Sequence, residues 1–353
     1  MNLNDLRKQI DELDLKIVAG LNRRLEITSK IRELKVKSGK GVYSPEREYE
    51  VIRRIKNTPR KFLSDAALEA IYREIMSSAL ALERPLKIAY LGPEATFTHL
   101  AALKRFGRQV EYIPSGSIAD VFKEVERANA DYGVVPVENS IEGAVTHTMD
   151  MLVDSDLRIC SQVVMNVSHN LLSRYPQEKI SRIYSKPEVF AQCRLWLQKN
   201  FPQAELIDAA STTRAAQIIQ EKKNSACIAS ILAASVYNLK VITRNIEDSP
   251  NNVTRFLVIG ENAAGPTGND KTSLVFSIKD KVGALHDMLA PFKKNRINLT
   301  KIESRPSKKK AWDYYFFMDL EGHIQDTKIA RALKELEAQA KYLKILGSYP
   351  NAE

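Results

Sequence analysis

The stretch LNRRLEITSKIRELK, residues 21–35, places two basic residues within the apolar stripe of a helix. At about 100° per residue, the stripe occupies an arc of about 80° and consists of Leu3, Leu6, Ile10, Leu13, Ile17, Leu21 and Ile31. Arg24 and Lys35 fall inside this arc, and Arg7 lies at its edge. A single such residue would be explained if its aliphatic stem lay along the apolar stripe while its charged group reached solvent. Two cations at the centre require opposing carboxylates or an anionic ligand, because unpaired buried charge is costly.

Residues 1–84 contain only helical patterns. The first helix is expected over residues 4–37, the second begins at Ser44-Pro45-Glu46 with Ser44 as its N-cap, and the third runs from Asp65 to about Glu83. A helix of about 34 residues would be about 50 Å long, more than two further helices of one chain can cover. The sequence therefore predicts a helical dimer.

The second and third helices add carboxylates to their own apolar stripes. Glu48 lies in the stripe of the second helix with Arg47 beside it, and Glu83 lies at the edge of the third stripe. One interpretation is a buried ion-pair network that joins Glu48 and Glu83 to Arg24 and Lys35. The other is a bound dianion, since Arg24 and Lys35 are about 16 Å apart along the axis. Arg7 is about 25 Å from Arg24, so it can reach the same ligand only across an antiparallel dimer.

Composition narrows the classes of function. The 353 residues carry a net charge of +10, but acidic and basic residues are interspersed and no nucleic-acid-binding motif occurs, so small anions are the expected ligands. No apolar run is long enough to span a bilayer, and the absence of a signal pattern predicts a cytoplasmic protein. Three separated cysteines and five scattered histidines predict reduced thiols and no metal site.

Residues 87–262 alternate short β-strand patterns with amphipathic helices expected over 117–128, 187–199 and 212–222. Two clusters of such units predict two lobes, joined by a crossover at RICSQVVMNV, residues 158–167. No Gly-rich nucleotide motif follows a strand, which disfavours a nucleotide cofactor.

Small polar residues gather where these strands end and helices begin. They are Thr96, Asn139, Ser140, Ser211, Thr212, Thr213, Thr254 and Arg255. Each residue alone is typical of a cap or a turn. Together they supply hydroxyls, backbone N–H groups and an arginine at strand ends, where α/β folds bind anions.

Residues 270–353 have a βαββαβ pattern. Strand TSLVFSIK is followed by helix GALHDMLAPFKKN, and INLTKIESRP and WDYYFFMDLEG form a hairpin closed by SKKKA. A helix over residues 326–340 and strand YLKILGSYP complete the unit.

With these residues in view, the helical segment resembles the all-helical chorismate mutase of bifunctional enzymes of aromatic biosynthesis. The resemblance implies that chorismate is held by Arg24, Lys35, Arg47 and Glu48 of one chain and Arg7 of its partner. Lys35 would donate to the ether oxygen. Some members use Gln as the second donor where this chain has Glu83, so Glu83 would have to be protonated.

Residues 87–262 are similar to prephenate dehydratase, most specifically at VPVENS and NNVTRF. The similarity implies a two-lobed α/β fold like that of periplasmic binding proteins, with the strand-end residues above binding prephenate. Thr254 would donate to the leaving hydroxyl, Arg255 would be a carboxylate or structural partner, and Glu138 could relay a proton. Two residues depart from the family pattern: Ala95 replaces a usual glycine, and Lys186 stands where histidine is frequent.

Residues 270–353 resemble the ACT regulatory domain through GAL and ESRP, which in the dehydratases binds phenylalanine at a dimer interface. The residues implied are Gly283, Ala284, Leu285, Glu303, Ser304 and Arg305. The plainer interpretation is that Gly283 starts a helix and ESRP ends a strand.

The resemblances together imply a multi-domain protein: an all-α mutase domain (1–84), a two-lobed α/β dehydratase domain (87–262) and an α+β ACT domain (270–353). The function implied is conversion of chorismate to prephenate and then to phenylpyruvate, with feedback inhibition by L-phenylalanine. A homodimer or homotetramer is expected, with no cofactor, metal, nucleic acid or membrane as partner. Two alternatives remain open, a non-enzymatic two-lobed sensor with a helical dimeriser and an arogenate dehydratase.

Overall fold

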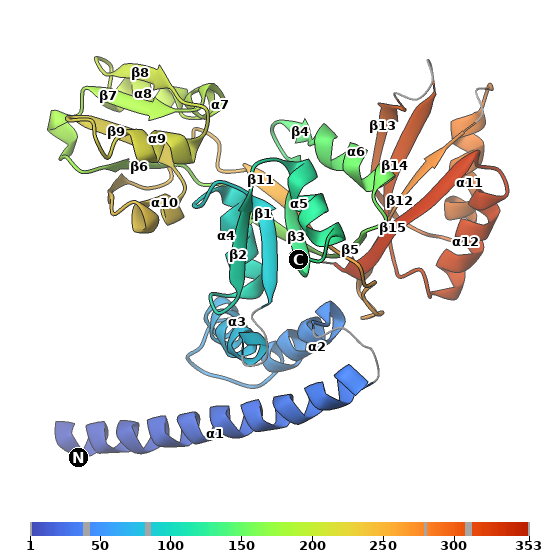
Figure 1. Ribbon diagram of the computed structural model, residues 1–353, viewed down its shortest axis with the longest axis horizontal. Coiled ribbons are helices and arrows are strands. Elements are labelled where there is room, and N and C mark those ends of the chain that lie inside the picture. Colours follow the sequence, from blue (N-terminus) through green and yellow to red (C-terminus); the bar gives the residue numbers. More distant parts are fainter. Residues whose placement is uncertain (1, 38–42, 82–85, 279–280, 308–312, 352–353) are drawn as a thin grey trace. The chain divides into compact units, whose positions relative to one another are not determined.

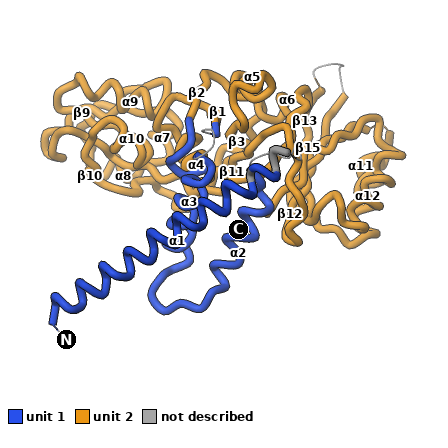
Figure 2. The backbone as a smooth tube through the Cα atoms, turned by 60° about the horizontal axis from the view of Figure 1, so that its bottom comes forward, with its two compact units in different colours: residues 1–86, 106–111 blue, residues 87–105, 112–353 orange. Residues whose placement is uncertain are grey.

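The computed structural model describes residues 2–37, 43–81, 86–278, 281–307 and 313–351. The chain forms two compact units, one of residues 1–86 with 106–111 and the other of residues 87–105 with 112–353 (Figure 2). The C-terminal segment expected to be a separate domain therefore shares a unit with the two-lobed segment.

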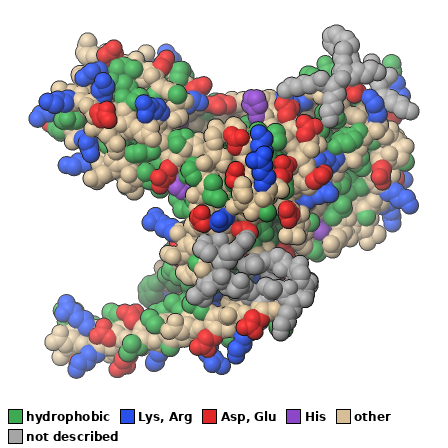
Figure 3. Space-filling model, viewed as in Figure 1, with side chains coloured by type: hydrophobic (Ala, Val, Ile, Leu, Met, Phe, Trp, Pro, Cys, Tyr) green, Lys and Arg blue, Asp and Glu red, His purple; other side chains and the backbone are tan. Residues whose placement is uncertain are grey.

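Three helices make up the first unit: α1 (Leu3–Lys37), α2 (Pro45–Lys56) and α3 (Asp65–Ala81). The predicted cap of α2 is confirmed, because the Ser44 side chain accepts a hydrogen bond from the Arg47 backbone N–H. Most of the apolar stripe of α1 is exposed, with Ile10 57%, Leu13 56% and Ile17 59% exposed, whereas Leu21 is only partly exposed. The described residues of one chain therefore leave most of this stripe uncovered, and hydrophobic side chains lie on the surface of this helix (Figure 3).

The first lobe is built on sheet A, whose strand order is β2-β1-β3-β11-β5, with β4 beside β3 (Figure 1). Its strands are β1 (Lys87–Leu91), β2 (Glu111–Ser115), β3 (Tyr132–Asn139), β4 (Gly143–Ala144), β5 (Arg158–Asn166) and β11 (Val253–Gly260), and its helices are α4 (Phe97–Phe106), α5 (Ile118–Glu126) and α6 (Thr146–Asp154). Strands β1 and β3 are parallel, whereas β11 runs antiparallel to both β3 and β5.

The second lobe is built on sheet B, whose order is β10-β6-β9-β7-β8. It contains β6 (Asn170–Ser173), the 3-10 helix η1 (Gln177–Lys179), β7 (Arg182–Ser185), α7 (Pro187–Gln192), α8 (Arg194–Asn200), β8 (Glu205–Asp208), α9 (Thr212–Ile218), β9 (Ser225–Ala229), α10 (Ile231–Val236) and β10 (Lys240–Thr243). The chain crosses between the lobes twice, after β5 and before β11, which confirms the predicted two lobes. The prediction that RICSQVVMNV forms the crossover is wrong, because Arg158–Asn166 is strand β5 of sheet A and the crossing follows it.

The single helix predicted over residues 187–199 is wrong, because it breaks at Cys193 into α7 and α8. The Asp248 carboxylate accepts hydrogen bonds from the backbone N–H groups of Leu195 (2.9 Å) and Trp196 (3.0 Å) and so caps α8. The Asp248 N–H donates to the carbonyl of Gln192, the last residue of α7. A residue distant in sequence thus ends one helix and begins the next, which local periodicity could not reveal.

The C-terminal domain has the predicted βαββαβ order: β12 (Asp270–Ser277), α11 (Ala284–Lys294), β13 (Leu299–Pro306), β14 (Tyr314–Glu321), α12 (Thr327–Glu337) and β15 (Tyr342–Pro350). Sheet C has the order β13-β14-β12-β15. Most of the predicted hairpin tip lies outside the described residues.

Sheet C is apolar on both faces. One face packs on α11 and α12, with Phe276, Phe292 and Leu336 in the core. The other face contributes Val275, Phe317, Leu346 and Tyr349 to a core that also contains Val137, Ile159 and Leu257 of sheet A. The approach is close enough that a Cβ at Gly347 would overlap the Ile159 backbone, so only glycine fits there. The C-terminal domain and the first lobe therefore share one hydrophobic core.

Candidate catalytic and effector sites

Asn139 and Thr254 are cross-strand partners on β3 and β11. The Asn139 Nδ2 group donates hydrogen bonds to Thr254 Oγ1 (2.8 Å) and Asn252 Oδ1 (2.7 Å). Its Oδ1 accepts from the backbone N–H groups of Ile141 (2.9 Å) and Glu142 (3.0 Å), which orients the amide. Because Thr254 Oγ1 accepts from Asn139, the hydroxyl keeps its own proton to donate to another group.

Gln192 and His169 extend this network into the second lobe, and the sequence analysis missed both. Gln192 Oε1 accepts from Asn252 Nδ2 (2.9 Å) and lies 2.7 Å from His169 Nε2. Burial lowers the pKa of His169, which favours the neutral ring, and the acceptor at Nε2 places its single proton there. The buried Nδ1 has no hydrogen-bond partner in the described part of the chain. The sequence analysis quoted the segment NNVTRF, which contains Asn252, the residue that joins Gln192 to Asn139. No other quoted segment pointed to Gln192 or His169.

Several other predicted residues cap helices or close turns. Thr96 Oγ1 donates to the Leu91 carbonyl (3.0 Å) and accepts from the His99 N–H (3.2 Å) at the start of α4. Ser140 Oγ donates to the Asn251 carbonyl (2.7 Å) and accepts from the Val253 N–H (2.9 Å). For these two residues the structure supplies the cap or turn contacts of the plainer interpretation.

The start of α9 follows the same logic. Ser211 is its N-cap and accepts from the Arg214 N–H (2.9 Å). Thr212 and Thr213 are buried, and Thr213 Oγ1 has no hydrogen-bond partner among the described residues. This hydroxyl lies in the first turn of α9 and is unsatisfied, but it is fully buried in this structure.

The structure accommodates both departures from the family pattern, at Ala95 and at Lys186. Ala95 adopts a φ of 67°, the left-handed conformation for which glycine is usual, and its N–H donates to His99 Nδ1 (3.1 Å). Lys186 precedes α7 and lies 3.4 Å from the Glu188 carboxylate. The turn at Ala95 is therefore formed without the glycine, at some cost in backbone strain.

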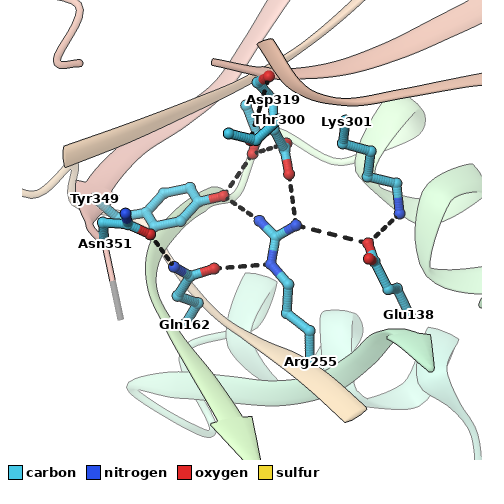
Figure 4. Close-up of polar contacts among 9 residues, drawn as sticks. Glu138, Gln162, Arg255, Thr300, Lys301, Asp319, Tyr349 and Asn351 are labelled. Atoms are coloured by element: carbon cyan, nitrogen blue, oxygen red, sulfur yellow. Dashed lines mark hydrogen bonds and ion pairs between the residues drawn. The ribbon is translucent and has the colours of Figure 1, made fainter. Parts of the chain in front are cut away.

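Arg255 and Glu138 do not face the Thr254 network; both turn toward sheet C (Figure 4). The Arg255 guanidinium donates to Asp319 Oδ2 (2.5 Å), Tyr349 Oη (2.7 Å) and Gln162 Oε1 (2.8 Å). Burial by itself lowers the pKa of Arg255, but Tyr349, Asp319 and Glu138 raise it above its usual value. The geometry favours the structural role of Arg255 over substrate binding, and it does not favour proton relay through Glu138.

In the first unit, Arg24 is half-buried and Glu48 is buried. Burial lowers the pKa of Arg24, and its Nη1 atom has no hydrogen-bond partner within the described residues. Glu48 forms an ion pair with Arg73 of α3, a residue that the sequence analysis missed. Among the described residues Glu48 therefore pairs with Arg73, and the network through Lys35 and Glu83 stays a prediction, because those two side chains lie outside the described residues.

Of the remaining mutase residues, the structure describes the side chains of Arg47 and Arg7. Arg47 is exposed and pairs with Glu50 at 2.9 Å, and Arg7 is exposed on α1. The side chain of Lys35 and the whole of Glu83 lie outside the described residues.

The predicted effector residues lie in two places in the C-terminal domain. One group is at the start of helix α11, and the other is on strand β13. Gly283 precedes α11 with a φ of +79°, which glycine adopts without strain, and it is followed by buried Ala284 and by Leu285, 37% exposed. Glu303, Ser304 and Arg305 lie on the edge strand β13, and Arg305 forms an ion pair with Asp150 of α6 at 2.7 Å.

Comparisons with known proteins match all three segments. Family models described as chorismate mutase type II, prephenate dehydratase and ACT domain match residues 6–84, 88–264 and 272–338. A protein of Aquifex aeolicus named bifunctional chorismate mutase/prephenate dehydratase is 48% identical over 99% of this chain and 98% of its own length. The chain belongs to the bifunctional chorismate mutase/prephenate dehydratase family.

Further relatives agree with this assignment to the bifunctional family. The protein of that name from Pseudomonas aeruginosa is 44% identical over 99% of this chain and 98% of its own length. The crystal structure of prephenate dehydratase from Arthrobacter aurescens in complex with L-Phe has a TM-score of 0.71 and 33% identity, covering 76% of this chain and 90% of that chain.

No helix in the described part of the chain is long and apolar enough to cross a membrane. No group of three or more His, Cys, Asp or Glu side chains among the described residues is placed to hold a metal ion.

Proposed function

We propose that this chain converts chorismate to prephenate in its helical unit and prephenate to phenylpyruvate in its two-lobed segment, with feedback inhibition by L-phenylalanine. The observation that carries the second step is the Asn139–Thr254 hydrogen bond, which leaves a hydroxyl proton free to donate. The full-length similarity to enzymes named for both reactions supports the pair of activities.

In the dehydratase reaction, prephenate loses hydroxide and carbon dioxide as its ring becomes aromatic. Aromatisation drives the step, so the protein has mainly to orient the dianion and assist the leaving hydroxyl. Thr254 donates to that hydroxyl, and Asn139 holds the Thr254 oxygen in place. Thr96, Ser140, Ser211, Thr212 and Thr213 contribute N–H groups and hydroxyls to the substrate's carboxylates. No cofactor takes part.

In the mutase reaction, a pericyclic rearrangement needs a compact substrate conformer and charge stabilisation at the breaking ether bond. Arg24, Lys35, Arg47 and Glu48 of one chain hold chorismate together with Arg7 of a second chain. The buried and unsatisfied Nη1 of Arg24 supports an anionic ligand there.

Chorismate binding by two chains requires a dimer. The exposed apolar stripe of α1 supports a homodimer, because a second copy of the stripe would remove both from water. Association of dimers would give the homotetramer. A protonated Glu83 is the second donor to the ether oxygen, so mutase activity should fall as pH rises. A flat mutase profile up to pH 9 would contradict this role of Glu83.

L-phenylalanine binds at Gly283, Ala284, Leu285, Glu303, Ser304 and Arg305. The domain limits are 1–84, 87–262 and 270–353, which the three matched ranges support. Three cysteines are free and buried: Cys160, Cys193 and Cys227. Free thiols are usual in the reducing cytoplasm, so they support the proposed cytoplasmic location.

The deciding experiment supplies chorismate to the purified protein and follows prephenate and phenylpyruvate separately, with and without phenylalanine. We expect both products, and less phenylpyruvate when phenylalanine is present. No turnover of chorismate or prephenate would favour a non-enzymatic sensor. Faster turnover of arogenate than of prephenate would favour an arogenate dehydratase.

A further inference from the structure

Two pairs of adjacent residues on sheet A present one side chain to each face of the sheet. Glu138 and Asn139 end β3, and Thr254 and Arg255 begin β11. The antiparallel register sets Thr254 opposite Asn139 and Arg255 opposite Glu138. Because successive side chains of a strand point to opposite faces, the hydrogen-bonded pair and the charged pair lie back to back on the same two stretches of backbone.

The C-terminal domain holds the charged pair. Lys301 Nζ forms an ion pair with Glu138, and Arg255 Nη1 lies 3.7 Å from the same carboxylate and 2.5 Å from Asp319 (Figure 4). The side chains of Lys301, Arg255 and Asp319 are only 16%, 11% and 8% exposed, whereas that of Glu138 is 39% exposed. The Arg255–Asp319 pair is therefore shielded from water, and the Lys301–Glu138 pair is shielded on its lysine side only.

Lys301 belongs to the strand that also carries the proposed effector residues. It lies on β13, and alternation places Lys301, Glu303 and Arg305 on one face of that strand. A ligand that moves this face of β13 therefore moves Lys301. A cavity of about 20 Å³, enough for about one water molecule, is lined by Lys301, Arg255 and Asp319 among others.

We propose that the Lys301–Glu138 ion pair links phenylalanine binding on β13 to the position of the Asn139–Thr254 pair. Lys301 is a positioning residue, because it reaches the hydrogen-bonded pair only through Glu138 and the β3 backbone. The proposal rests on the proposed function and identifies the contact that regulates the dehydratase site. Coupling of this kind requires that phenylalanine bind one arrangement of the Lys301–Glu138 contact more tightly than another.

The test uses the full-length chain with Lys301→Met, which keeps the length of the side chain and removes its charge. Prephenate turnover is measured over a titration with phenylalanine, and phenylalanine binding is measured by calorimetry. We expect binding to persist while the phenylalanine concentration for half-inhibition rises at least about tenfold, within the range of known coupling energies.

Two further variants control the result. Lys341→Met removes an ion pair to Asp313 (3.0 Å) inside the C-terminal domain, and it should leave inhibition unchanged. Lys301→Arg keeps the positive charge opposite Glu138, and it should retain the inhibition that Lys301→Met loses. Inhibition that depends on the shape of the lysine side chain alone would not be retained in this way.

Inhibition of Lys301→Met at wild-type phenylalanine concentrations would overturn the link. Loss of phenylalanine binding in this variant would also overturn it, since Lys301 would then belong to the effector site. A Lys301→Met chain that is inactive without phenylalanine supports the link if Lys301→Arg is active and inhibited, and contradicts it otherwise. A wild-type chain that does not turn over prephenate, or is not inhibited, would contradict the proposed function itself.

Discussion

At the scale of single residues, the position from which Thr254 donates a hydrogen bond depends on the group that binds its hydroxyl oxygen. A hydroxyl is a weak acid, so its value to a leaving group lies in a fixed donor position rather than in its pKa. Asn139 supplies that fixation from the neighbouring strand. Replacing Thr254 with Val keeps the shape and removes the donor, so we expect the dehydratase kcat to fall by about 10²-fold to 10³-fold.

Turnover of prephenate by the purified variant measures this effect. Thr254→Ser retains the hydroxyl and should retain most of the activity, and chorismate turnover should be unchanged in both variants. A Val variant with wild-type dehydratase activity would exclude Thr254 as the donor.

His169 supplies a prediction about pH. Burial lowers the pKa of His169 in the folded protein, although Gln192, Glu247 and Glu142 partly oppose this effect. Below the ordinary histidine pKa of about 6.5, the unfolded chain therefore binds more protons than the folded one. The stabilisation from neutral His169 is complete above this pH and is lost as pH falls toward the lowered folded value.

The thermal midpoint of the wild-type protein should therefore fall as pH decreases from about 7 to 5. His169→Gln, whose amide nitrogen takes the place of Nε2 and can still donate to Gln192, should reduce this dependence. His286→Gln, at a surface histidine, should not. A pH dependence equal in His169→Gln and wild type would contradict the argument.

At the scale of elements, α1 is a helix whose apolar face is left mostly uncovered by the described residues of its own chain. Leu13 lies at the middle of the stripe and is 56% exposed. Leu13→Glu would place a charge in the dimer contact, so we expect dissociation to monomers and loss of chorismate turnover, because Arg7 would no longer reach the partner's site.

Analytical ultracentrifugation measures this dissociation. Lys30→Glu, on the opposite side of α1, is the matched control and should remain dimeric. Prephenate turnover should persist in the Leu13→Glu variant, since Thr254 and Asn139 belong to the other unit. A monomeric wild-type protein with mutase activity would contradict the shared site.

At the scale of the whole molecule, the first lobe and the C-terminal domain share one core. A chain that ends after residue 262 would expose Val137, Ile159 and Leu257 where sheet C packs. We expect its thermal midpoint to fall by at least about 5 °C, which corresponds to the loss of one or two kcal/mol in a domain of this size. Prephenate turnover should remain, without inhibition by phenylalanine, because Thr254 and Asn139 lie on the opposite face of sheet A. An unchanged midpoint would contradict the shared core.

The order of the elements and the family were determined by local sequence. The helical stripe of α1, the cap at Ser44, the βαββαβ pattern and the VPVENS and NNVTRF segments all depend on residues close together in the chain. The physical reason is that helix periodicity, strand alternation and capping are satisfied within a few residues. The Asn139–Thr254 pairing also followed in outline, since both residues lie at strand ends.

Only the tertiary structure showed on which face of its sheet each side chain lies and which distant residues it contacts. Arg255 was grouped with Thr254 by sequence, yet the pleat of β11 turns it toward Asp319 and Tyr349. Arg73 rather than Arg24 pairs with Glu48, Asp248 splits a predicted helix, and Gln192 and His169 join the Thr254 network from the other lobe. These contacts join residues far apart in the chain, and partners of that kind leave no periodic signal in one sequence.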